Sequence, residues 1–67
     1  MAKIKVIWFD DTESYVMGNR MFTQFVDKAR EYKSVLIAAR SARKIKSNDE
    51  LIKDVKIITD TEIYNVW

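Results

Sequence analysis

The chain lacks cysteine and histidine altogether. Without cysteine it has no disulfide bridge, thiolate nucleophile, iron–sulfur cluster or thiolate zinc site. Without histidine it lacks the commonest general base and the commonest metal ligand of proteins. There is no proline to break a helix, and the single glycine, Gly18, cannot form a glycine-rich phosphate loop. We therefore expect a protein that is not an enzyme and that has no cofactor or metal site.

Long uncharged stretches are also missing. No run approaches the roughly 20 apolar residues of a membrane-spanning helix, so we expect no membrane partner. Residues 1–9 include Lys3 and Lys5, which is wrong for the apolar core of a signal peptide. We expect a soluble protein of the cytoplasm.

Sixty-seven residues suffice for a single domain, which we place over residues 1–67. An apolar fraction of 48%, with two tryptophans, three tyrosines and three phenylalanines, favours a folded globule over a disordered tail. A chain of this length buries only about 60% of its unfolded surface, so its margin of stability is narrow. We expect a permanent partner or a homo-oligomer to widen that margin.

The pattern of apolar residues predicts an α+β fold. Residues 3–9 alternate like a strand and are rich in β-branched and aromatic side chains, whereas residues 14–17 are either a second strand, forming a hairpin, or a loop. Gly18 and Asn19 are typical of a helix start, and apolar residues then recur at three- and four-residue spacing over residues 20–32. This spacing predicts an amphipathic helix.

The second half of the chain has two interpretations. Continued spacing favours one helix over residues 20–45, and the alternative is a short strand over residues 35–39. Ser47 and Glu50 match a capping box, which predicts a short helix over residues 48–54. Residues 55–58 and 62–67 have β character and predict a C-terminal strand or hairpin. We therefore expect an N-terminal strand, one long or two central helices, a short capped helix and a C-terminal strand, with both ends paired in one small sheet covered by helix.

Three acidic side chains, Asp10, Asp11 and Glu13, follow the first strand. Carboxylates at a strand end are suitable ligands for a hard cation such as Mg²⁺. The sequence offers no further identifiable oxygen ligands and little room for a substrate pocket. We expect a solvated turn and no metal site.

Positive charge gathers in the middle of the chain. Residues 32–46 hold five basic side chains and no acidic one, and residues 47–67 hold two lysines and five acidic side chains. Arg40, Arg43 and Lys44 would share one face of a helix, with Lys46 nearby, and such a ridge suits phosphate contacts. The alternative is a solvated helix end that the acidic C-terminal segment neutralises.

Aromatic residues near the two chain ends are the best candidates for a protein contact. Trp67 is either docked on its own domain or exposed as an anchor, and Tyr64 and Trp8 are the other candidate contact residues. We expect a small binding module that occupies a surface of another protein, as phage and plasmid accessory proteins do when they inhibit or regulate a host enzyme. The alternative is a small nucleic-acid-binding regulator that uses residues 40–46.

Overall fold

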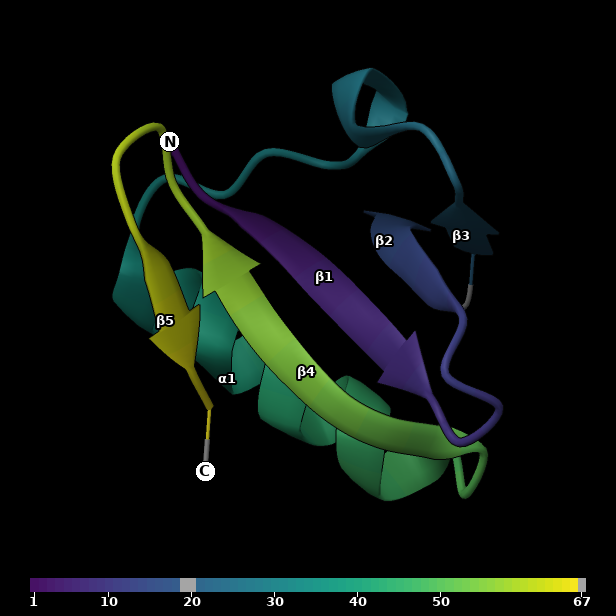
Figure 1. The fold of residues 1–67 in the computed structure, drawn as a ribbon. Coiled ribbons are helices and arrows are strands. Elements are labelled where there is room, and N and C mark those ends of the chain that lie inside the picture. Colours follow the sequence, from purple (N-terminus) through teal and green to yellow (C-terminus); the bar gives the residue numbers. More distant parts are fainter. Residues whose placement is uncertain (19–20, 67) are drawn as a thin grey trace.

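The computed structural model describes residues 1–18 and 21–66, which form a five-stranded antiparallel sheet covered on one face by a helix (Figure 1). The strand order in the sheet is β3-β2-β1-β4-β5. The elements are β1 (Lys3–Trp8), β2 (Glu13–Gly18), β3 (Met21–Thr23), a 3₁₀ turn (Val26–Lys28), α1 (Val35–Asn48), β4 (Ile52–Ile58) and β5 (Ile63–Asn65). The expected α+β class and the pairing of the two chain ends in one small sheet are confirmed.

The core lies between α1 and the central strands. Val6 lies opposite Val55 and Ile4 opposite Ile57, and all four side chains are fully buried. The helix meets them with Ala38 and Ala42, which are also fully buried. Because alanine is small, the helix backbone lies close to the sheet at these two positions. We call this contact the helix–sheet seam, and little space remains in it for a larger side chain.

The segment that leads from the 3₁₀ turn to α1 is tied to the sheet by backbone hydrogen bonds. The Arg30 amide donates to the Val16 carbonyl at 2.8 Å, and Ala2 and Tyr32 exchange bonds of 2.9 and 2.7 Å. Ala29 and Tyr32 are buried beside the core. The chain thus crosses from the β3 edge to the helix layer along a fixed path.

The helix expected over residues 20–32 is wrong. Residues 14–17 belong to β2, and β3 pairs with this strand through Tyr15 opposite Thr23 and Val16 opposite Phe22. Cross-strand pairing of aromatic and β-branched side chains stabilises this hairpin. The spacing of apolar residues along the chain does not indicate such pairing. Within residues 21–32 only Ala29 and Tyr32 are buried, and both lie in the extended segment after the 3₁₀ turn. The apolar spacing that suggested a helix therefore does not mark one buried face.

The helix expected in the middle of the chain is confirmed from Val35 onward, and the strand expected as an alternative over residues 35–39 is wrong. One continuous helix from residue 20 is also wrong, because Ser34 caps α1. The Ser34 hydroxyl accepts a hydrogen bond from the Ile37 amide at 3.2 Å. This bond satisfies one of the free amides at the helix start.

The short capped helix over residues 48–54 is wrong as well. Ser47 lies inside α1, where its hydroxyl donates to the Lys44 carbonyl at 2.9 Å instead of capping a new helix. The chain enters β4 at Ile52, and the strand pairs with β1 from there to Ile58. The C-terminal strand expected over residues 62–67 is the shorter β5, and Trp67 lies outside the described residues. No helix in the described part of the chain is long and apolar enough to cross a membrane.

Candidate functional site

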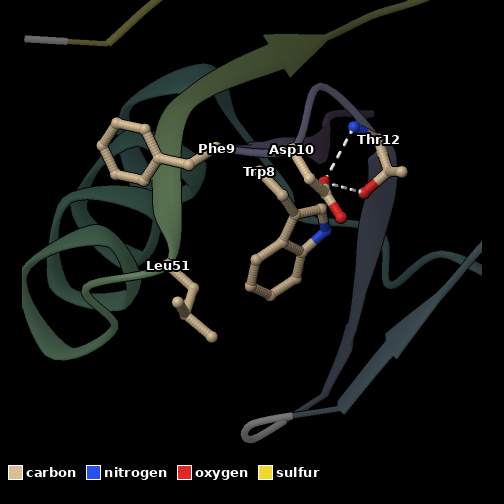
Figure 2. Close-up of a pocket in the computed structure, with 5 residues that line it drawn as sticks. All are labelled: Trp8, Phe9, Asp10, Thr12 and Leu51. Atoms are coloured by element: carbon tan, nitrogen blue, oxygen red, sulfur yellow. Dashed lines mark hydrogen bonds between the residues drawn. The ribbon is translucent and has the colours of Figure 1, made fainter.

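A hollow of about 480 Å³ opens at the end of the sheet where two turns meet. One turn joins β1 to β2, and the other joins α1 to β4. The lining residues are Trp8, Phe9, Asp10, Thr12 and Leu51 (Figure 2). Figure 2 shows the Trp8 indole and the Leu51 side chain reaching into the same space, with the Phe9 ring directed away from the indole. The walls are therefore mainly apolar, and Asp10 and Thr12 form a polar rim.

Local hydrogen bonds hold the first turn in shape. The Asp11 amide donates to the Trp8 carbonyl at 2.9 Å, and the Trp8 amide donates to the Thr12 carbonyl at the same distance. Asp11 has a φ of 68°, a left-handed conformation that aspartate tolerates better than most residues. One Asp10 oxygen accepts hydrogen bonds from the Thr12 hydroxyl at 2.6 Å and the Thr12 amide at 3.0 Å.

The Trp8 indole is fixed on two sides. Its Nε1 donates to the Ser14 hydroxyl at 3.2 Å. Its ring lies edge-to-face against Phe22, with 5.0 Å between ring centroids and 76° between planes. An indole held in this way presents its free surface to the hollow without further loss of conformational freedom on binding.

Leu51 is held over the hollow although its side chain is largely in solvent. It is 69% exposed, and Phe9 is 64% exposed. The Phe9 amide donates to the Leu51 carbonyl at 3.1 Å, and the Leu51 amide donates to an Asp49 carboxylate oxygen at 3.0 Å. The two exposed apolar side chains are thus presented by backbone that is bonded in place.

The surroundings of the hollow are acidic. The two turns carry Asp10, Asp11, Asp49 and Glu50, and the basic partner among the described residues is Lys53, whose Nζ lies 3.2 Å from Asp11. The hydrogen bond from the Thr12 hydroxyl, followed by that from the Thr12 amide, lowers the pKa of Asp10. The rim therefore carries negative charge at neutral pH.

The carboxylates that follow β1 do not converge. Asp10 is bonded to Thr12, Asp11 is paired with Lys53, and Glu13 is paired with Lys5 at 2.9 Å. Across residues 1–18 and 21–66, no group of three or more acidic side chains is placed to hold a metal ion. What the arrangement offers is an apolar hollow with an acidic rim.

The residues expected to form a protein contact are not all brought together. Trp8 is part of the hollow, whereas Tyr64 lies on the edge strand β5 and is 38% exposed. Trp8 lies opposite Ile52 on β4 and Tyr64 opposite Ile57. Five residues of strand separate these positions by about 16 Å, so they belong to different surfaces. A hydrogen bond to Glu62 is the main cause that raises the pKa of Tyr64. Trp67 lies outside the described residues.

Leu51, Phe9 and Thr12 were missed from the sequence. The pattern predicts Leu51 inside a helix over residues 48–54 and Phe9 within the strand over residues 3–9. The available signal was the pair of polar, acidic sequences, 10–13 and 47–50, each adjoining a large apolar residue.

The basic side chains of α1 stand apart from this site. Arg40, Arg43 and Lys44 are exposed, and the Nζ of Lys46 lies 3.8 Å from a carboxylate oxygen of Asp54. Within the described part of the chain, the Lys46 pair is the only ion pair of 4.0 Å or less between residues 40–46 and the acidic C-terminal segment. The acidic segment therefore neutralises little of the basic ridge directly.

Comparison with known proteins gives no relative: the chain matches no family model, no curated protein and no solved structure.

Proposed function

We propose that this protein is a non-enzymatic binding module that seats an apolar side chain of another protein in the hollow between Trp8 and Leu51. The observation that carries the proposal is the fixed indole beside an exposed leucine on a hydrogen-bonded turn. Contacts of this kind resemble the centres of protein interfaces, where a rigid aromatic residue packs against an anchor of the partner. A preformed pocket also lowers the entropy cost of association.

The acidic rim restricts the chemistry of the partner. Four carboxylates against one lysine favour a positive charge beside the bound side chain. The expected partner segment therefore combines a large apolar residue with an adjacent lysine or arginine. By occupying such a segment, the module would block a surface of its target, which is how a phage- or plasmid-type inhibitor or regulator of a host enzyme would act.

Selection from a random peptide library on the immobilised chain tests this proposal. We expect the enriched peptides to share a large apolar residue next to a basic one. They should bind the wild type and the Ile63→Ser variant with equal affinity and the Leu51→Ser variant more weakly. Ile63 is a matched control because it is 63% exposed and lies on β5, away from the hollow. No enrichment, or equal loss of binding in both variants, would contradict the proposal.

A second candidate function is a nucleic-acid-binding regulator, which the exposed Arg40, Arg43 and Lys44 favour. Three phosphate contacts would give a log–log dependence of affinity on salt with a slope of about −2 to −3. Replacing Arg40 and Arg43 by glutamine should then reduce the slope by about 2. Weak binding with no response to this double variant would remove the candidate.

A further inference from the structure

A second hollow, of about 560 Å³, lies between α1 and the segment that precedes it. We call it the α1 groove. Its polar lining residues are Arg30 and Tyr32 on that segment and Ser41, Lys44 and Asn48 on the helix. The groove shares no lining residue with the hollow at Trp8.

Helix spacing brings the three polar side chains of α1 to one side of the groove. Ser41, Lys44 and Asn48 follow each other at three- and four-residue intervals, which places them along one stripe of the helix. They supply a hydroxyl, an ammonium and a carboxamide. Ile37 and Ile45 also line the groove and add apolar wall to the same side.

Arg30 lines the side of the groove that the segment before α1 forms, and its neighbours hold it in position. Its guanidinium carbon lies 5.3 Å from the centroid of the Tyr32 ring, and Tyr32 is only 8% exposed. The amide of Arg30 is bonded to Val16, and Tyr32 is bonded to Ala2, so both backbone positions are fixed. A cation–π contact of this kind uses no N–H group of the guanidinium as a hydrogen-bond donor to the protein, so these donors can serve an oxyanion.

The positive charge of the groove is not neutralised within the described part of the chain. The ion pairs there join Lys5 with Glu13, Lys46 with Asp54, and Lys53 with Asp11, and none involves Arg30 or Lys44. The hydrogen bonds there likewise leave the side chains of Ser41 and Asn48 without a protein partner. Two cations, a hydroxyl and a carboxamide thus line one space, and none of them has an ion pair or a side-chain hydrogen bond with another residue of ranges 1–18 and 21–66.

We propose that the α1 groove binds the phosphate group of a nucleotide or of a nucleic-acid strand. Arg30 and Lys44 contact the phosphate oxygens, Ser41 and Asn48 donate further hydrogen bonds, and Ile37 and Ile45 contact the apolar part of the ligand. A volume near 560 Å³ falls within the usual range for small-ligand pockets. The proposal is independent of the protein-binding function, which uses the other hollow.

The test is a titration of the ¹⁵N-labelled full chain followed by NMR at constant ionic strength and neutral pH. The probes are inorganic phosphate, adenosine monophosphate, adenosine and a short oligothymidylate. We expect saturable shifts of amides 30–32 and 41–48 with the phosphate-bearing probes, with adenosine monophosphate saturating below about 1 mM, and no shift with adenosine. A larger affinity for the oligothymidylate at the same amides would identify a strand as the source of the phosphate, and an equal affinity would identify the free nucleotide.

Matched variants separate the groove from general basic charge. Arg30→Gln and Lys44→Gln should each weaken binding about tenfold, whereas Arg43→Gln should change it less than about twofold. Arg43 is exposed on the same helix, does not line the groove, and loses the same charge. Equal weakening by Arg43→Gln, loss only in the Arg40→Gln/Arg43→Gln double variant, or no saturable shift with any phosphate probe would overturn the proposal.

Discussion

Replacing Leu51 with serine separates the contribution of this residue to binding from its contribution to folding. About a third of the leucine surface is buried within the domain, since the side chain is 69% exposed. Complete burial of a leucine stabilises by roughly 1.5–3 kcal/mol, so the folded domain should lose at most about 1 kcal/mol. The exposed two thirds become buried only in the complex, which corresponds to about 1–2 kcal/mol of binding free energy. This is roughly a fivefold to thirtyfold loss of affinity.

Two measurements on the same variant check these magnitudes. Urea denaturation followed by circular dichroism gives the free energy of unfolding, and titration with the tightest peptide selected on the wild type gives the affinity. Ile63→Ser serves as the control because it removes an equally exposed apolar side chain from β5. It should lose little stability and no affinity.

A loss of several kcal/mol of stability in Leu51→Ser would contradict this prediction, because Leu51 would then be a core residue. Wild-type affinity of Leu51→Ser for the peptide together with lost affinity of Ile63→Ser would also contradict it, because the contact would then lie along β5.

Three further predictions follow from the fold. Ala42 is fully buried against the sheet, so Ala42→Leu should cost about 1–3 kcal/mol by overpacking; an unchanged urea midpoint would disprove the close seam. The Ser34 hydroxyl caps α1, so Ser34→Ala should cost about 1 kcal/mol and lower the melting temperature by roughly 4–8 °C; an unchanged melting curve would contradict the cap. The lowered pKa of Asp10 implies stability that is present above its unfolded pKa, near 3.8, and is lost as pH falls through the folded pKa. Thr12→Val removes the hydroxyl and keeps the amide, so it should raise this pKa and reduce the loss of stability in acid. An NMR titration of the Asp10 carboxyl with an unmoved midpoint would show that the Thr12 hydroxyl is not the cause.

The central strands could be predicted from the sequence because their burial pattern follows the period of a strand. Ile4 and Val6 alternate with Lys3 and Lys5, and this pattern predicts both the strand and its inner face. The inner residues of β4, Val55 and Ile57, follow the same rule. Which face of a strand is buried follows from the alternation of apolar and polar residues within that strand, so the sequence shows it directly.

The region between residues 20 and 34 could not be predicted in this way. Phe22 is packed because β3 pairs with β2, and Tyr32 is packed because it bonds to Ala2. Ala2 is far from Tyr32 in the sequence, and the β2–β3 hairpin places Phe22 by strand pairing. The combined spacing of these apolar residues nevertheless imitates a helical period. Tertiary pairing overrides a local pattern in such a case.

The hollow itself was not predicted, and Trp8 is the one lining residue that the sequence indicated as a contact with a partner. Its other apolar wall, Leu51, comes from a turn whose capping-box sequence indicated a helix. Instead of a helix the chain forms a turn immediately before β4, in which the Leu51 amide donates a hydrogen bond to the Asp49 carboxylate. Aspartate supports either arrangement, and the pairing of β4 with β1 decides between them.

Cross-saturation NMR on the complex of this chain with its selected peptide tests most directly whether the hollow is the binding surface. Saturation of the peptide protons should attenuate the amides of residues 8–12 and 49–51 most strongly, with the Trp8 indole N–H among the affected signals. Attenuation centred on β5, or on the exposed face of α1, with residues 8–12 and 49–51 unaffected, would contradict the account.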